Sequence, residues 1–386
     1  MTTVWHIVTG EYPPTAGGVS DYTRSVATGL AAAGDEVHVW CPVNAEHAGA
    51  PGVNVHGIAG AWTRMDLRRL DEALAPFPGP RRLLVQWVPH AYGRRSLNVA
   101  FCRWVRRRAG AGDVVDLMIH EPGLGFGEGG LRHNLAAALH RWMLLLLLGR
   151  ARRVWVAIPA WIETIRPWAL GRDLAFCWLP IPGSIPVSGA GDEVRRVREA
   201  LLDGRTGVVV GHFSTYSREI RAALREIVPA LLERAPGVRV LLLGRGGESA
   251  LAELRDATPH ADRLHAAGPL DSAALSCRLQ ACDLLLQPYP DGASTRRSTL
   301  MTAMAHGLPV VTTIGRLSEP FWRQTDAVDV LPAGDAAAIA RAVTDLAAEP
   351  ERRNRLGASA RATYDARFSL GHVIAALRAD ACEAAG

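Results

Sequence analysis

Short apolar runs alternate with amphipathic stretches along most of the chain. In the first half, an apolar run at 4–9 precedes a glycine-containing loop and a stretch with helical spacing from about Ser20 to Ala33; further apolar runs follow at 36–40, 82–87, 114–119 and 153–158. Short buried runs separated by helices are typical of parallel strands in an α/β sheet. The first half is therefore predicted to be a Rossmann-like domain with a doubly wound sheet.

The same pattern begins again after a stretch rich in proline, glycine and serine. Apolar runs at 207–213, 238–243, 263–267, 283–287 and 309–313 alternate with predicted helices at 218–234, 249–256 and 272–281. Segments of that composition commonly link domains. We therefore predict an N-terminal Rossmann-like domain over residues 1–185, a linker over 186–205 and a C-terminal Rossmann-like domain over 206–368. Residues 369–386 are predicted to form a helix that crosses back to the N-terminal domain.

Polar, glycine-rich loops follow the predicted strands. These loops read EYPPTAGG, HEPG, GHFSTYSR, GRGG and PYPDGASTRR. Ligands of open parallel sheets bind outside the carboxyl ends of the strands, and clefts between domains are common ligand sites. We therefore expect these loops to line a ligand site in a cleft between the two domains.

The segment from Gln287 to Thr313 is the most informative part of the chain. It reads QPYPDGASTRRSTLMTAMAHGLPVVTT and contains a predicted helix whose first turn is Arg296-Arg297-Ser298-Thr299. The unpaired N–H groups and dipole of a helix N-terminus attract anions, and guanidinium and hydroxyl groups add donors. One interpretation is a phosphate site, and the alternative is a capped helix with solvated arginines.

Composition excludes several classes of protein. The 386 residues have a formal net charge of +5, and all 43 basic residues are arginine. Without lysine, the chain has neither a Schiff base for pyridoxal phosphate nor a Walker A loop. The positive charge is spread along the chain, which does not favour a nucleic-acid partner. The six cysteines form no CxxC pair and the histidines do not cluster, so we expect no metal site.

We expect a cytoplasmic protein. The N-terminal residues MTTVWHIVTG lack the features of a signal peptide, and the longest apolar run, Trp142–Leu148, is too short to span a bilayer. The basic runs Arg103–Arg108 and Arg150–Arg153, near tryptophans and this leucine block, suggest peripheral contact with an anionic membrane at its inner face. The alternative is that the leucines are core and the arginines are solvated.

Three further motifs have both a functional and a structural interpretation. Gly17-Gly18 before a helix suits a ligand close to backbone N–H groups, or a glycine-rich turn. His120 ends an apolar strand, where it could bond a ligand hydroxyl or phosphate or have a structural role, and His90 invites the same two interpretations. Residues 125–130, GFGEGG, match the dinucleotide fingerprint in letters but lack the acidic residue expected downstream.

The order of these motifs resembles the retaining, GT-B-fold glycosyltransferases of family four, also called glycosyl transferases group 1. The similarity lies in EYPPTAGGVSDYTRSVATGLAAAGDEVHVW, WLPIPGSIP at the domain junction, VRVLLLGRGGE, HAAGPLDSAALSCRLQACDLLLQPYPDG and LMTAMAHGLPVVTT. It covers essentially the whole chain and is most specific in the second half. The resemblance implies two Rossmann-like α/β domains whose parallel sheets face each other across a cleft.

The resemblance also implies a function. Family members are hexosyltransferase-like enzymes that use a nucleotide-sugar donor, bound mainly by the second domain, and they need neither a metal nor another cofactor. Gly17 and Gly18 match the family's glycine loop, and His120 matches its cleft histidine. Gly244, Gly268 and Leu270 fall where the family contacts the base and sugar of the donor. The diphosphate would lie at Ser298 and Thr299.

The chain departs from the family at two places. Of the family's two glutamates, spaced eight residues apart, the second is replaced by Thr302 and the first by Ser294; the nearest carboxylate is Asp291. The family's phosphate-binding arginine is replaced by His212, and the basic residue farther on is Arg218. We infer that Arg296 and Arg297 supply the missing charge, because arginine can bind phosphate at least as well as lysine.

The sequence therefore predicts a retaining glycosyltransferase that moves a sugar from a nucleotide donor to a small-molecule, glycan or lipid-linked acceptor. His120 and Asp291 are the predicted catalytic residues. Those predicted to bind the diphosphate are Gly17, Gly18, Arg218, Arg296, Arg297, Ser298 and Thr299; those predicted at the base and sugar are Gly244, Gly268, Leu270, Ser294 and Thr302. The alternatives are a GT-B protein that binds nucleotide sugar without catalysis, and a nucleotide-sugar epimerase.

Overall fold

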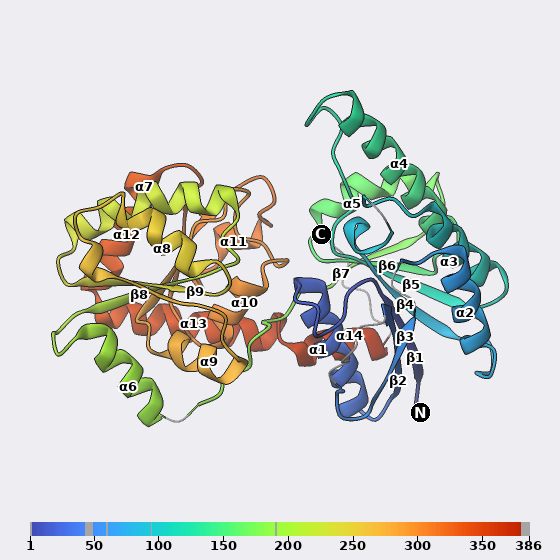
Figure 1. Cartoon of the computed structure of the whole chain (residues 1–386), viewed down its shortest axis with the longest axis horizontal. Helices are drawn as coiled ribbons and strands as arrows, with labels where there is room; N and C mark the ends of the chain where they lie inside the picture. Colours follow the sequence, from blue (N-terminus) through green and yellow to red (C-terminus); the bar gives the residue numbers. More distant parts are fainter. Residues whose placement is uncertain (1, 43–48, 59–60, 94, 190, 380–386) are drawn as a thin grey trace. The chain divides into compact units, whose positions relative to one another are not determined.

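The computed structural model describes residues 2–42, 49–58, 61–93, 95–189 and 191–379, which divide into two compact units (Figure 1). Unit 1 comprises the described residues up to Ile181 and those from Leu370 onward, and unit 2 comprises those from Pro182 to Ser369. The prediction of an α/β protein with two parallel sheets is confirmed, because every strand pairing in both units is parallel.

Unit 1 has a sheet in the order β3-β2-β1-β4-β5-β6-β7. The order reverses between β1 and β4, as expected of a doubly wound sheet. Its elements are β1 (Val4–Thr9), α1 (Gly18–Ala32), β2 (Glu36–Pro42), β3 (Val53–Ile58), α2 (Arg64–Leu74), β4 (Arg82–Trp87), a 3-10 turn (Pro89–Ala91), α3 (Val99–Gly110), β5 (Val114–Ile119), α4 (Leu131–Leu148), β6 (Arg153–Val156), α5 (Ala160–Ile165), a second 3-10 turn (Arg166–Ala169), β7 (Ala175–Trp178) and α14 (Leu370–Ala379).

Unit 2 repeats this plan with a sheet in the order β10-β9-β8-β11-β12-β13, which reverses between β8 and β11. Its elements are α6 (Gly191–Leu202), β8 (Val208–Phe213), α7 (Arg218–Arg234), β9 (Val238–Leu243), α8 (Gly247–Arg255), a 3-10 turn (Ala261–Arg263), β10 (Leu264–Ala267), α9 (Ser272–Gln280), β11 (Leu284–Gln287), α10 (Ser298–Ala305), β12 (Val310–Ile314), α11 (Phe321–Gln324), β13 (Asp329–Pro332), α12 (Ala336–Ala348) and α13 (Pro350–Arg367).

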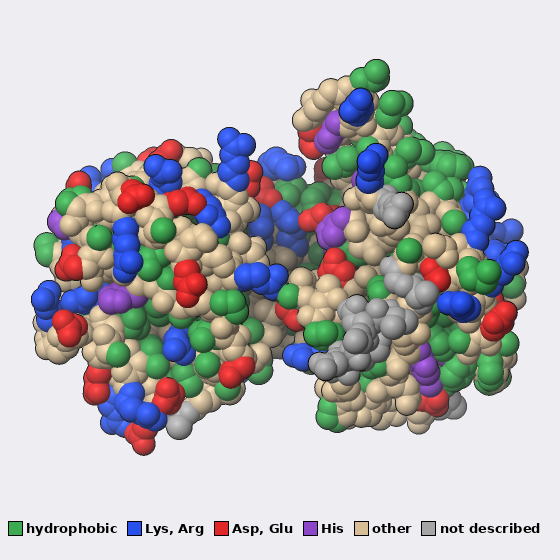
Figure 2. Space-filling model, viewed as in Figure 1, with side chains coloured by type: hydrophobic (Ala, Val, Ile, Leu, Met, Phe, Trp, Pro, Cys, Tyr) green, Lys and Arg blue, Asp and Glu red, His purple; other side chains and the backbone are tan. Residues whose placement is uncertain are grey.

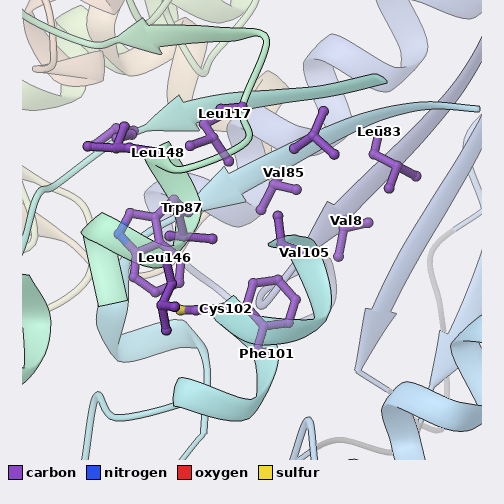
Figure 3. Packing of buried hydrophobic residues seen from close by; sticks show 14 of the residues in the cluster. Val8, Leu83, Val85, Trp87, Phe101, Cys102, Val105, Leu117, Leu146 and Leu148 are labelled. Atoms are coloured by element: carbon purple, nitrogen blue, oxygen red, sulfur yellow. The ribbon is translucent and has the colours of Figure 1, made fainter. Parts of the chain in front are cut away.

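The core of unit 1 explains why the leucine block in α4 is so apolar. Side chains of α3 and α4 pack on the strands, as Figure 3 shows for Phe101, Cys102, Leu146 and Leu148. Met143, Leu144 and Leu147 are buried as well. Most of this block is therefore core, and its leucines are not the ones exposed for contact with a membrane.

The segment predicted as a linker, residues 186–205, contains helix α6 instead. Arg198 of this helix bonds the Asp283 carboxylate at 2.7 Å and the carbonyl of Ala281 at 3.0 Å, which ties α6 to the rest of unit 2. Charged residues dominate its sequence, GDEVRRVREALL, and they conceal the helical spacing of its few apolar positions. The boundary between the units lies earlier, between Ile181 and Pro182.

Helix α14 belongs to unit 1, although it is distant from the rest of that unit in sequence. It packs on α1, and Arg378 bonds the buried Asp35 carboxylate at 3.0 Å. The same carboxylate accepts from the indole of Trp5 at 3.1 Å and from the backbone of Thr3 at 3.2 Å. Residues 380–386 of the predicted C-terminal segment lie outside the described residues.

None of the helices built from described residues combines the length and the hydropathy needed to span a bilayer.

Candidate functional site

The reversal of strand order in unit 2 places two polar loops side by side. β8 and β11 are neighbours, and the loops that follow them, residues 214–217 and 288–297, leave the same edge of the sheet. Crevices at such reversal points are where open α/β sheets bind ligands. Loop 288–297 contains Asp291, Arg296 and Arg297, so the structure brings these predicted site residues to that edge.

Asp291 holds both arginines of this loop. Its two carboxylate oxygens each form an ion pair, one with Arg296 and the other with Arg297. Burial alone would raise the pKa of Asp291, but the two guanidiniums outweigh that effect and lower the pKa. The cluster therefore contains an ionised carboxylate between two cations, with one positive charge in excess.

Tyr289 fixes one of the arginines and the start of α10. The Arg297 guanidinium lies over the Tyr289 ring, 4.8 Å from its centre, and the Tyr289 hydroxyl bonds the hydroxyl of Thr299 at 2.8 Å. Burial raises the pKa of Tyr289 to about 12, so its hydroxyl keeps its proton. Tyr289, which the sequence analysis did not single out, therefore links Arg297 to Thr299.

Helix α10 begins at Ser298, two residues later than predicted. Arg297 occupies the position before the first turn and gives that turn no side-chain cap. Ser298 and Thr299 are the first two residues of the helix, where backbone N–H groups have no partner within the helix. Four of the predicted diphosphate residues, Arg296, Arg297, Ser298 and Thr299, thus lie at a helix N-terminus whose N–H groups remain suited to an anion.

The buried carboxylate of Glu319 fixes loop 288–297 through a backbone hydrogen bond. Glu319 accepts from the backbone N–H of Thr295 at 3.0 Å and from the indole of Trp322 at 2.6 Å. Burial raises the pKa of Glu319, although these donors act in the opposite direction. Gly292, at φ +90°, and Gly315 lie in close contact, and a Cβ on Gly292 would be 2.2 Å from the nitrogen of Gly315.

The histidine at the family's arginine position is neutral. His212 is buried, it donates from Nδ1 to the carbonyl of Leu286 at 2.7 Å, and burial lowers its pKa to about 4. It therefore supplies no positive charge for a phosphate. Arg218, the first residue of α7, is exposed, and Arg245, in the loop after β9, is a further exposed arginine on the same edge that the sequence analysis missed.

The remaining residues predicted at the donor divide into two groups. Gly244, Gly268 and Leu270 follow β9 and β10, on the same edge of the sheet. Gly244 has φ +101°, and a Cβ there would be 2.3 Å from the carbonyl oxygen of Ser214. Ser294 and Thr302, by contrast, are fully buried, and the Thr302 hydroxyl accepts from the backbone of Ser184 at 3.0 Å. Direct contact of these two with a donor would require them to move.

Unit 1 has a second polar edge where its own strand order reverses. His120 follows β5, and its Nε2 donates to the Gln86 side chain at 2.8 Å. The Tyr22 ring packs edge-on against the imidazole, with 4.9 Å between ring centres. Burial lowers the pKa of His120 to about 3, so the ring is neutral. Gly17 and Gly18 are at the N-terminus of α1, and a Cβ on Gly17 would be 2.4 Å from the Glu11 carboxylate.

An ion pair that the sequence did not predict lies at this edge. The imidazole of His90 is 3.4 Å from the carboxylate of Glu11. The hydrogen bond to Glu11 raises the pKa of His90 despite partial burial, and Glu121 also contributes. The two residues come from the loops after β1 and β4, which are neighbours only in the folded sheet.

The family assignment rests on unit 2. Residues 204–349 match the family described as Glycosyl transferases group 1. Over these residues the chain belongs to the group 1 glycosyltransferases. This match includes Asp291, both arginines and all of α10, so the charged cluster before α10 lies within the matched segment.

Relatives of this glycosyltransferase cover more than the matched domain. The phosphatidyl-myo-inositol mannosyltransferase of Mycobacterium leprae is 26% identical over 287 residues, 68% of this chain and 72% of that protein. The protein of the same name from Mycolicibacterium smegmatis is 29% identical over 199 residues, 50% of this chain and 48% of that one.

Solved structures extend the similarity of fold to the whole glycosyltransferase. HepE of Anabaena, in complex with UDP, has a TM-score of 0.70 at 15% identity and covers 98% of this chain and 99% of its own. The sucrose-phosphate synthase of Thermosynechococcus elongatus has a TM-score of 0.71 at 16% identity, covering 98% of each chain. The fold is therefore GT-B.

No group of three potential metal-binding side chains occurs within the part of the glycosyltransferase that the structure describes. The absence of a metal or other cofactor from the reaction stays a prediction.

Proposed function

We propose that this glycosyltransferase moves a sugar from a nucleoside-diphosphate sugar to an acceptor hydroxyl, with retention of configuration and without a metal ion. The observation that carries the proposal is the cluster of Asp291, Arg296 and Arg297 in front of the N-terminus of α10. HepE, which shares the fold, has been solved with UDP and with UDP-glucose, and this supports a donor of that chemical class.

The proposed chemistry needs negative charge to be stabilised on the leaving diphosphate. The acceptor oxygen bonds to the anomeric carbon as the bond from that carbon to the diphosphate breaks, and the acceptor proton passes to a phosphate oxygen. Charge accumulates on the diphosphate as the bond breaks, so prearranged donors there lower the barrier most. The N–H groups of Ser298 and Thr299, with Arg296 and Arg297, would supply these donors, with Arg218 in support.

Asp291 has two roles in this proposal. It holds both guanidiniums in place, and because each guanidinium has five N–H donors, each can bind phosphate without leaving Asp291. Its carboxylate would also accept from a hydroxyl of the donor sugar, in place of the family's glutamate. Gly244, Gly268 and Leu270 would contact the base and sugar.

On the acceptor side, we propose His120 at the reacting centre. A neutral imidazole held by Gln86 contributes a hydrogen bond and no charge. The relatives named as phosphatidyl-myo-inositol mannosyltransferases support an acceptor of the polyol or lipid-headgroup type. Gly17 and Gly18, predicted to bind the donor diphosphate, would let that group approach the backbone at the start of α1.

The double variant Arg296→Ala/Arg297→Ala tests the diphosphate site. We expect donor turnover to fall by roughly 100-fold or more, because removal of even one prearranged donor from a developing anion has an effect of that order. The matched control is Arg195→Ala/Arg196→Ala, which removes two arginines from an exposed face of α6 in the same unit. Release of nucleoside diphosphate measures turnover, and circular dichroism measures folding.

Undiminished turnover in the folded Arg296→Ala/Arg297→Ala variant would contradict the site. Tight donor binding by the wild-type chain, with no hydrolysis or transfer across a broad acceptor panel, would instead indicate a binding protein without catalysis. A panel of nucleotide sugars in a thermal-shift assay identifies the donor, because a ligand that binds only the folded state raises apparent stability by mass action.

A further inference from the structure

Helix α4 has an exposed apolar stripe on the face opposite its buried one. Leu131, Leu135, Leu139 and Trp142 are 76%, 58%, 37% and 39% exposed. Their spacing of four, four and three residues places them on one face of the helix. Figure 1 shows the N-terminal half of α4 extending away from the strands of unit 1. The stripe is separate from the buried leucine block that follows it.

The glycine-rich loop before α4 exposes two further apolar side chains. Leu124 and Phe126 are exposed, and the loop is bonded to the helix at three points. His133 donates to the carbonyl of Gly125 at 2.9 Å, Asn134 accepts from the backbone of Gly127 at 2.9 Å, and His140 accepts from the backbone of Leu124 at 3.0 Å. These three helix residues lie on the side of the helix away from the stripe, so the α4 face is defined by the helix alone: Leu131, Leu135, Leu139 and Trp142.

Several arginines lie on α4 and on the neighbouring helix α3. Helices α3 and α4 together contain six arginines and no carboxylate. The Arg103 guanidinium lies 5.3 Å from the centre of the exposed Trp142 ring, and Arg106 and Arg132 are exposed on the same two helices. Figure 2 shows hydrophobic side chains gathered over this part of unit 1, with basic side chains among and beside them.

We propose that the α4 face binds the surface of an anionic lipid bilayer. An amphipathic helix that lies in the interface puts leucine and tryptophan at the boundary of the acyl chains and arginine among the phosphates. Charge disfavours a second copy as the occupant, because two such faces would bring arginines against arginines. An anionic surface complements both the stripe and the arginines.

The position of the α4 face connects it to the reaction. Loop 121–130 joins His120 to the first residue of α4, so the N-terminal end of the α4 face is one loop away from the edge of unit 1 that we assign to the acceptor. This step rests on the proposed function and implies an acceptor hydroxyl carried by a membrane lipid. Binding to the bilayer does not depend on it.

Flotation of the full chain with vesicles tests the proposal. We expect binding to vesicles of phosphatidylcholine mixed with phosphatidylglycerol, and little binding to phosphatidylcholine alone. Leu131→Ser/Leu135→Ser should weaken binding by on the order of tenfold or more, because two leucines no longer leave water. The control Val187→Ser changes an exposed apolar residue of unit 2 and should bind like the wild type.

A second pair of variants tests the charge. Arg103→Gln/Arg132→Gln should weaken binding by roughly fivefold for each arginine removed, whereas Arg195→Gln/Arg196→Gln should not. Wild-type chain that ignores both kinds of vesicle would overturn the proposal, as would a leucine variant that binds unchanged. So would a self-association, seen by sedimentation, that the leucine variant abolishes. Transfer to a water-soluble acceptor should persist in these variants, which separates this test from that of the proposed function.

Discussion

At the scale of single residues, the site is defined by where its charges are held. Asp291 is kept ionised by two arginines, His212 is kept neutral by burial, and His120 is kept neutral while bonded to Gln86. In the proposed diphosphate site, the positive charge therefore comes from the arginines of loop 288–297 and the N-terminus of α10, with Arg218 in support. The fixed protonation states follow from packing and do not depend on a bound ligand.

His90 should titrate at a higher pH than a free histidine, and Glu11 is the reason. A carboxylate partner that favours the charged imidazole stabilises the folded state at pH values below the pKa that this histidine has in the unfolded chain. This contribution is lost as the pH rises through the higher pKa that the histidine has in the folded state. NMR titration of the imidazole should give a midpoint above 6.5, the ordinary value. Glu11→Gln should lower that midpoint.

His120 is the internal control for this titration. Burial lowers its pKa to about 3, so its imidazole signals should stay constant between about pH 5 and about pH 8, where exposed histidines change charge. A midpoint of His90 that is unchanged in Glu11→Gln would contradict the ion pair, and a His120 that titrates in this range would contradict its burial.

At the scale of elements, the site depends on two loops that are in contact through one glycine of each loop. Gly292 in loop 288–297 and Gly315 after β12 are so close that neither position has room for a side chain. This contact, together with the Glu319 anchor, determines where Asp291 and its two arginines lie. The geometry of the proposed anion site is therefore maintained by residues outside the cluster of Asp291 and its two arginines.

Gly292→Ala should disturb the anion site more than an ordinary glycine substitution does. Gly292 has φ +90°, and the new Cβ would lie 2.2 Å from the nitrogen of Gly315. We expect a loss of about 1–3 kcal/mol in the free energy of unfolding from backbone strain alone, and weaker donor binding from displacement of the loop. Urea unfolding and donor titration measure the two effects.

The matched control is Gly334→Ala. Gly334 has φ +92°, but a Cβ there meets nothing within 4 Å. This variant therefore has the same backbone strain as Gly292→Ala but no steric clash with a neighbouring loop. Donor binding that weakens equally in both variants would indicate that the loop contact is unimportant.

The elements also show how far the sequence predicted the structure. The central strands were predicted because they are continuous apolar runs buried on both faces. β3, β7 and β13 were missed; all three lie at sheet edges, and their side chains are less completely buried than those of the central strands. The two arginines before α10 were predicted because they are neighbours in sequence, but their shared partner Asp291 depends on the turn at Gly292. The Glu11–His90 pair was missed because it joins loops of different strands.

At the scale of the whole molecule, one unit is a single segment of the sequence and the other is made of two segments. Unit 2 is one continuous segment, whereas unit 1 needs α14 from beyond unit 2. Val373, Ile374 and Leu377 of α14 are buried in the same core as Val26 and Leu30 of α1. A change in α14 should therefore act on unit 1.

Leu377→Ala should lower the stability of unit 1 and leave unit 2 unchanged. Leu377 is fully buried, and removal of a buried leucine side chain lowers the free energy of unfolding by about 2–5 kcal/mol. Calorimetry should show one thermal transition moving to lower temperature. Leu346→Ala, at a fully buried position of α12 in unit 2, should move the other transition. If Leu377→Ala moves the transition that Leu346→Ala moves, α14 does not stabilise unit 1.

The place of α14 has a consequence for the order in which the chain folds during synthesis. Domains commonly fold from the N-terminus as they emerge from the ribosome. Here residues 182–369 are complete before residues 370–379 are made, so unit 2 has its whole sequence available first. Until then, the face of α1 around Gly29, which contacts Ile374 in the finished structure, lacks its cover. Unit 1 therefore becomes complete only after the whole of unit 2 has been synthesised.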